Sequence, residues 1–134
     1  MLSDTICTEK YIQNINAVTL AFVGDAVHSL FVREILACHH DYKSGVLQKL
    51  AATHQSAKGQ SEQYHKIAAL LTAEEQQIFL RARNAKKMSK SKSATIAEYN
   101  ISTGYEAVLG YLYLSNRQDR LHYLLKQAMQ IIEE

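Results

Sequence analysis

Apolar residues recur at helical spacing along nearly the whole chain, and no proline interrupts them. Apolar side chains three and four residues apart form one face of an α-helix, whereas the period-two alternation of half-buried strands is hard to find here. The spacing predicts helices over residues 15–39, 44–56, 57–71 and 102–114, another opened by a Thr72–Glu75 capping box, and a last one capped by Asn116. We therefore expect an all-α fold, formed by residues 1–134 as a single domain.

Composition excludes several classes of protein. The chain has 134 residues, of which 47% are hydrophobic and 21% charged, as in ordinary globular domains. No run of apolar residues is long enough to predict a membrane span, and the N-terminus has no basic stretch leading into an apolar one, as a secretory signal would. Two cysteines, Cys7 and Cys38, are too few for a disulfide framework or a zinc site, which favours a reduced, cytoplasmic protein.

Charge is distributed unevenly along the chain. Ten basic residues and only three acidic ones lie between Lys43 and Lys92, so this span carries about +7 while the rest carries about −5. A basic centre between acidic flanks indicates a surface that binds a polyanion. The alternative is a solvated, lysine-rich face with no partner.

Two of the expected helices carry a carboxylate and a glycine inside apolar surroundings. In LAFVGDAV, Gly24 precedes Asp25, and in STGYEAVLGYLYL, Glu106 precedes Gly110 by one helical turn. Glycines would let the two backbones approach closely and bring Asp25 toward Glu106. On the first helix we expect the core stripe to be Leu20, Val23, Val27, Leu30 and Phe31. Phe22 then shares the face of Asp25, which predicts a contact with another protomer.

Two carboxylates held close together repel each other unless a cation lies between them. Mg²⁺ takes oxygen ligands, keeps several waters, and is often held by one or two carboxylates plus substrate phosphates. Such a site beside a basic surface is suited to cleaving a phosphodiester with a metal-activated water. The alternative is that both acids lie at the solvent edge of amphipathic helices and bind nothing.

Several separated stretches resemble the ribonuclease III family. LAFVGDAVHSLFVRE is similar to the family's signature helix, and YEAVLGYLYL to its second acidic helix, in the same order and spacing. SAKGQ and RARNAK support the resemblance, which spans nearly the whole chain. The likeness is strongest to the short form of the family, which has the catalytic domain and lacks a double-stranded-RNA-binding domain.

The resemblance implies roles for three residues. Asp25 matches the catalytic aspartate, Glu106 the metal-binding glutamate, and Phe22 an aromatic that plugs into a pocket on the partner in a homodimer. It also implies Mg²⁺-dependent cleavage of double-stranded RNA, with Mn²⁺ as a substitute ion, leaving 5′-phosphate and 3′-hydroxyl ends. Two further acids of full-length members are replaced, at Ala21 and Thr103, which puts a full two-metal site in doubt.

The resemblance further implies a biological substrate. The short form is associated with trimming precursor 23S ribosomal RNA at its paired termini, and a large-subunit ribosomal protein is a candidate further partner that presents the RNA. A-form RNA is bound mainly through phosphates and 2′-hydroxyls, which suits arginine, lysine and amide side chains. The residues expected to contact the duplex are Lys58, Gln60, Arg81, Arg83, Asn84 and Lys86, with Lys87, Lys90 and Lys92 on a basic loop.

Two other functions stay open at this point. Because two of the family's acids are absent, the chain could be a helical RNA-binding or ribosome-assembly factor that keeps the fold without cleaving. A more remote alternative is a helical protein-interaction module whose basic face has no role. Near the candidate site, His28 is expected to be a partly buried structural histidine.

Overall fold

The computed structural model describes residues 1–86 and 94–130, and its elements there are helices. Their bounds are α1 (Glu9–Asn14), α2 (Ala17–His39), α3 (Ser44–Gln55), α4 (Ala57–Ile67), η1 (Ala68–Leu70, a 3₁₀ turn), α5 (Ala73–Asn84), α6 (Ile96–Leu114) and α7 (Gln118–Ala128). The all-α prediction is confirmed. Within these ranges, none of the helices is both long and apolar enough to cross a bilayer. Most of the expected basic loop, including Lys87, Lys90 and Lys92, lies outside the described residues.

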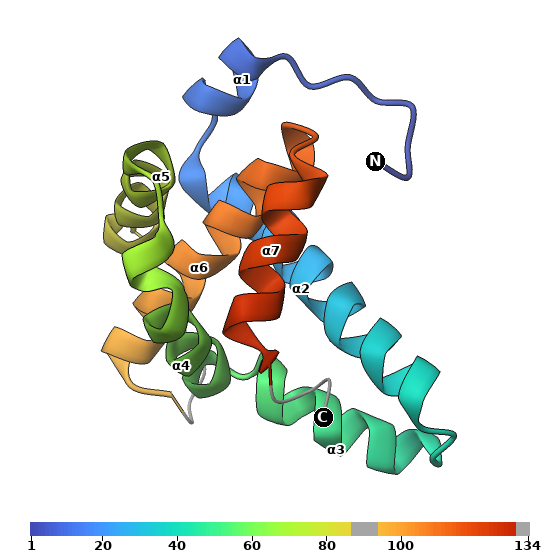
Figure 1. Cartoon of the computed structure of the whole chain (residues 1–134). Coiled ribbons are helices and arrows are strands. Elements are labelled where there is room, and N and C mark those ends of the chain that lie inside the picture. The colour runs from blue at the N-terminus through green and yellow to red at the C-terminus, as the bar shows by residue number, and fades with distance from the viewer. Residues whose placement is uncertain (87–93, 131–134) are drawn as a thin grey trace.

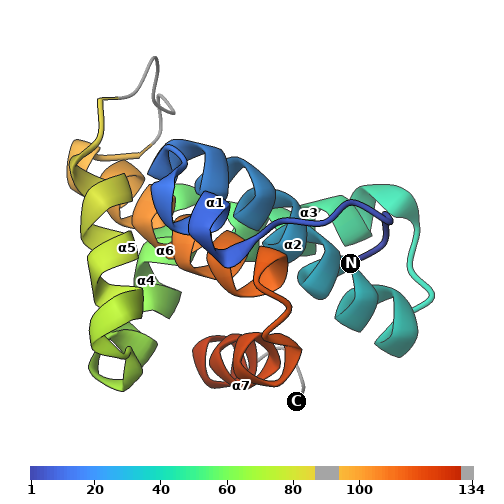
Figure 2. The ribbon, with the colours of Figure 1, turned by 90° about the horizontal axis from the view of Figure 1, so that it is seen from above.

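Helix α6 forms the centre of the molecule. It packs most extensively against α2, then against α5 and α4, and more lightly against α7. Figures 1 and 2 show α6 between α5 on one side and α2 on the other, with α3 extending from the far end of α2. Accordingly α6 contributes much of the core, including the fully buried Tyr105, Leu109 and Leu112, which meet Leu20 and Val32 of α2 in one apolar cluster.

The buried face of α2 differs from the expected stripe. The side chains that face the core are those of Ala17, Leu20, Ala21, Gly24, His28, Val32 and Leu36. Leu30 is half-exposed and Val27 only partly buried. The helix is turned toward its small residues, because a close approach to α6 leaves no room for large ones at the crossing. His28 is consequently fully buried, rather than partly as expected.

Helix ends show which local signals were read correctly. The capping box of Thr72 and Glu75 is present, as predicted. Helix α6 begins at Ile96, six residues before the expected start, because Thr95 and Glu98 form a second capping box. The prediction that Asn116 caps the last helix is wrong. Asn116 has a positive φ of 59° and belongs to the turn after α6, and the N-cap of α7 is Arg117, which makes no side-chain capping bond.

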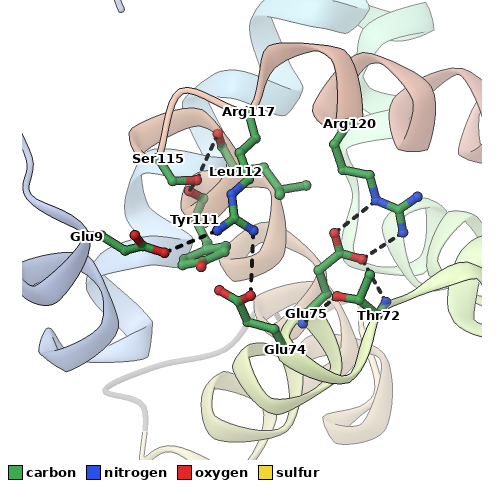
Figure 3. Close-up of polar contacts among 9 residues, drawn as sticks. All are labelled: Glu9, Thr72, Glu74, Glu75, Tyr111, Leu112, Ser115, Arg117 and Arg120. Carbon is green, nitrogen blue, oxygen red and sulfur yellow. Dashed lines mark hydrogen bonds and ion pairs between the residues drawn. The ribbon is translucent and has the colours of Figure 1, made fainter.

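A buried ion pair ties α7 to α5 (Figure 3). The carboxylate of Glu75 is 2% exposed and accepts two hydrogen bonds from Arg120, at 2.9 and 2.8 Å. Burial opposes ionisation of Glu75, but the bonds from Arg120 and Thr72 outweigh it and lower its pKa. Arg117 adds weaker surface pairs with Glu9 and Glu74. These contacts fix α7 and α1 around the C-terminal end of α6.

Candidate metal centre

The two glycines mark the place where the backbones of α2 and α6 touch. A Cβ on Gly24 would overlap the carbonyl group of Glu106, and a Cβ on Gly110 would overlap the carbonyl oxygen of Leu20. Any larger residue at either position would therefore push the helices apart. The predicted close approach is confirmed, and it explains why a long core helix keeps a residue that costs about 1 kcal/mol in helix propensity.

This crossing brings Asp25 and Glu106 within hydrogen-bonding reach of each other. Asp25 is exposed and Glu106 is partly buried, so the pair lies at the surface with its inner half in the protein. Burial raises the pKa of Glu106 to about 9, and so do the hydrogen bond that its protonated form donates to Asp25 and the negative charge of Asp25. Without a cation, Glu106 therefore holds a proton at neutral pH.

A divalent cation fits this donor set. Both side chains offer carboxylate oxygens, the ligands preferred by Mg²⁺, and a positive ion would replace the proton that the pair otherwise shares. The positions of the family's other two acids add no ligand charge, since Ala21 is buried and the Thr103 hydroxyl donates to the Tyr99 carbonyl at 3.0 Å. In the described ranges no cluster of three or more histidine, cysteine or acidic side chains could hold a metal. Water and substrate phosphates must then complete the coordination.

Gln60 does not lie where we expected it. Its side chain is 2% exposed and points inward, where its amide donates to Glu106 Oε2 at 3.3 Å. The prediction that Gln60 contacts RNA is therefore wrong. The residue lies in the core and bonds to the Glu106 carboxylate from its buried side. The sequence pattern also did not reveal that Gln63 and Tyr105 are buried beside His28 and bonded to each other. The available signal was the i, i+3 spacing of Gln60 and Gln63 on the same face as Ile67, which places two amides on a core-facing side.

The basic residues near the site have different surroundings. Lys58 and Lys86 are exposed. Arg83 lies over the ring of Phe79 at 5.9 Å and donates to the Asn84 side chain at 3.1 Å. Arg83 and Asn84 are both exposed, at the C-terminal end of α5. Arg81 instead donates to the main-chain carbonyls of Gln13 and Ile15, at 3.3 and 2.8 Å. It fastens the end of α1 to α5, which leaves fewer of its N–H groups for a phosphate.

Phe22 projects from α2 close to Asp25 and is 80% exposed. The exposure we predicted for this aromatic is confirmed. Farther along α2, a groove of about 380 Å³ opens between α2, the end of α6 and α7. Apolar side chains such as Val27, Leu30 and Phe31 line it together with the polar side chains of Glu34, Gln118, Asp119 and His122. The chain therefore carries both a projecting ring and a recess along α2.

Comparison with known proteins defines the class. The profile of the ribonuclease III domain matches residues 18–117, which include both carboxylates and both glycines. A crystal structure of a protein from Fusobacterium nucleatum superposes with a TM-score of 0.81 at 30% identity, covering 87% of this chain and 95% of that one.

Curated relatives narrow the class further. Mini-ribonuclease 3 of Thermoanaerobacter sp. (strain X514) is 36% identical over 96% of this chain and 91% of its own length. Mini-ribonuclease 3 of Staphylococcus aureus (strain NCTC 8325 / PS 47) is 35% identical over 94% and 96%. The chain belongs to the Mini-ribonuclease 3 group of the ribonuclease III family. Membership supports an endoribonuclease that acts on double-stranded RNA.

Proposed function

We propose that the chain is a homodimeric, Mg²⁺-dependent endoribonuclease that cleaves double-stranded RNA at Asp25 and Glu106. The observation that carries the proposal is the carboxylate pair itself, held at a glycine-to-glycine crossing of two helices although two ionised carboxylates at this distance would repel each other. A fold does not need such a pair, since an uncharged residue at either position would pack without the repulsion. A bound cation would remove the repulsion between the two carboxylates and would give the pair a role in catalysis.

In this mechanism Asp25 and Glu106 bind and orient the ion. An Mg²⁺ ion held there would supply Lewis-acid chemistry, by which a water is activated for attack on phosphorus and charge on the phosphodiester is neutralised. Hydrolysis breaks the bond to the 3′ oxygen, which leaves a 3′-hydroxyl on one product and a 5′-phosphate on the other. Asp25, the more exposed of the two, is the side chain that the RNA backbone would meet first.

The exposed basic residues bind the duplex by its backbone. Lys58 lies in the first turn of α4, the helix whose Gln60 contacts Glu106, while Arg83 and Asn84 end α5 and Lys86 follows two residues later. Their lysine, guanidinium and amide groups suit phosphates and 2′-hydroxyls, which identify an A-form helix by its shape. Affinity should therefore fall steeply as the salt concentration rises.

Dimerisation gives the enzyme a surface long enough for a duplex. Phe22 of one protomer enters an apolar recess of its partner, and the groove beside α2 and α7 is the recess of suitable character on this chain. Twofold symmetry then supplies two centres, one for each RNA strand.

For the substrate, we propose the paired ends of precursor 23S ribosomal RNA, presented with a large-subunit ribosomal protein. The support is the chain's membership of the Mini-ribonuclease 3 group together with its shape-reading basic surface. Such a precursor is met in the cytoplasm. A second candidate, a non-catalytic RNA-binding factor, is favoured only by the replacement of two family acids at Ala21 and Thr103.

One assay separates the two candidates. Purified protein is incubated with a long RNA duplex, with and without Mg²⁺, beside Asp25→Asn and the control Asp41→Asn, which removes an exposed carboxylate at the far end of α2. We expect metal-dependent cleavage by the native protein and the control, and a loss of at least about a hundredfold in Asp25→Asn. Duplex binding without cleavage by the native protein would instead establish the non-catalytic factor.

A further inference from the structure

A line of buried hydrogen bonds runs from the backbone of α3 to the candidate metal centre. Gln63 Nε2 donates to the main-chain carbonyl of His54 at 2.9 Å, and Gln63 Oε1 meets His28 Nε2 at 2.7 Å. On the other side of its ring, His28 Nδ1 meets Gln60 Nε2 at 3.4 Å. The same Gln60 Nε2 donates to Glu106 Oε2 at 3.3 Å. The side chains of His28, Gln60 and Gln63 are 5% exposed or less.

Which atom donates and which accepts in each bond of this line follows from the His54 carbonyl at its far end. A main-chain carbonyl can only accept, so the NH₂ group of Gln63 must face His54 and its Oε1 must face inward. The Tyr105 hydroxyl also donates to that oxygen, at 3.0 Å. Gln63 Oε1 is therefore an acceptor, and the His28 Nε2 beside it must carry the hydrogen.

The tautomer of His28 in turn determines how the Gln60 amide is oriented. A neutral ring with hydrogen on Nε2 has an acceptor at Nδ1, so Gln60 must turn its NH₂ group toward His28. Burial lowers the pKa of His28, in keeping with a neutral ring. In this orientation Gln60 offers Glu106 an N–H donor, whereas the opposite orientation would set an amide oxygen against a carboxylate oxygen.

We infer that Gln60 is a positioning residue for the metal centre and that His28, anchored through Gln63, sets the orientation of its amide. The bond to Oε2 fixes the rotamer of Glu106 and leaves its other oxygen for Asp25 and the cation. A ligand side chain held in one orientation by a neighbouring hydrogen bond binds a metal more tightly than one free to turn. The inference rests on the proposed function, because it assigns these residues to the ion that Asp25 and Glu106 would hold.

A purely structural network would look the same in a static structure, so the test must measure metal binding. Mn²⁺ serves as the probe, because its free and bound forms are distinguished by electron paramagnetic resonance. The whole protein is titrated without RNA. Gln60→Met keeps the volume of the side chain and removes the donor, and we expect it to weaken Mn²⁺ binding about tenfold or more.

The matched control is Tyr64→Phe. Tyr64 is buried one turn farther along α4, its ring stacks on Phe79 with the centroids 4.0 Å apart, and its hydroxyl bonds to Gln76, which is not part of the line. We expect it to bind Mn²⁺ as the native protein does. Equal weakening in Gln60→Met and Tyr64→Phe would show a general loss of packing and overturn the inference, as would unchanged affinity in Gln60→Met.

A second pair of variants tests the part played by His28 and decides the matter if Gln60→Met does not fold. His28→Gln keeps one acceptor and one donor on a side chain of similar length, and should retain most of the affinity. His28→Leu removes both and should weaken binding to the level of Gln60→Met. Native affinity in His28→Leu would overturn the role of His28. Native protein that binds no Mn²⁺ would instead overturn the proposed function itself.

Discussion

At the scale of single residues, the candidate site is a place where the fold accepts an unfavourable interaction. Glu106 is partly buried beside Asp25, with the Gln60 amide as a counterweight. Its pKa of about 9, against an ordinary value of 4.5, means that the folded protein keeps a proton that the unfolded chain releases. A proton and a metal ion therefore compete for these carboxylates, so metal binding should strengthen as pH rises.

Stability of the metal-free protein should fall as pH rises. Because the pKa of Glu106 is raised to about 9 on folding, the folded state binds more protons between 4.5 and about 9, and this contribution is lost across that window. Urea unfolding at several pH values in the presence of a chelator measures the effect. Glu106→Gln should remove most of the slope, and Glu62→Gln, on the exposed side of α4, should keep it. An identical slope in Glu106→Gln would contradict the assignment.

Tyr111 should tolerate the loss of its hydroxyl. The side chain is fully buried, and within the described residues its hydroxyl has no hydrogen-bond partner. We expect Tyr111→Phe to leave stability unchanged or raise it by up to about 1 kcal/mol, because an unpaired polar group leaves the core. The comparison is Tyr105→Phe, whose hydroxyl donates to Gln63 and whose loss should cost about 1 kcal/mol. Equal destabilisation of the two variants would contradict this account.

At the scale of elements, the crossing of α2 and α6 is the contact on which the site depends. It is formed by backbone against backbone, so it positions two carboxylates without relying on long, flexible side chains. Two neighbouring helices support this crossing. Helix α4 contributes Gln60, whose amide bonds to Glu106, and α5 packs against α6.

Gly24→Ala should be severely destabilising. The added Cβ would overlap the Glu106 carbonyl, a main-chain group that cannot move alone, so we expect a loss of more than about 3 kcal/mol in the free energy of unfolding. Gly45→Ala is the control, since a Cβ there meets nothing within 4 Å, and it should stabilise α3 by about 0.5 kcal/mol. Urea unfolding followed by circular dichroism measures both. A mild Gly24→Ala variant would disprove the close approach.

Local signals in the sequence predicted the helices better than they predicted which faces are buried. Spacing and the Thr72 cap sufficed for most helix bounds, but the polar residues before Thr95 concealed the start of α6. The glycines predicted that Asp25 and Glu106 would meet. They could not predict that Gln60 lies behind Glu106, because its burial depends on how a third helix packs against the other two.

At the scale of the whole molecule, the chain shows two surfaces that a lone protomer leaves unused. The first is the proposed dimer interface, with Phe22 as its projecting ring and the groove beside α2 and α7 as its recess, and the second carries the exposed basic residues of α4 and α5. A dimer would cover the first and lengthen the second. Asp25 lies three residues after Phe22 on α2, so both centres would be close to the proposed dimer interface.

Phe22→Glu should therefore separate the protomers. A charge in place of an 80% exposed ring leaves the monomer fold intact but cannot enter an apolar recess. Sedimentation velocity should show a dimer for the native protein and a monomer for the variant, with equal helical content. Ile96→Glu, at an apolar position at the start of α6 that is 61% exposed, is the control and should stay dimeric. A native monomer, or a dimeric Phe22→Glu, would contradict the proposed interface.

The central claim is that Asp25 and Glu106 act as one unit around one cation, and single-turnover cleavage of an RNA duplex in Mg²⁺ tests it most directly. The rates of Asp25→Asn, Glu106→Gln and the double variant are compared with the native rate. We predict that each single substitution lowers the rate at least about a hundredfold and that combining them costs little more, because either one already removes the ion. A native rate in either single variant, or losses that multiply in the double variant, would contradict the account.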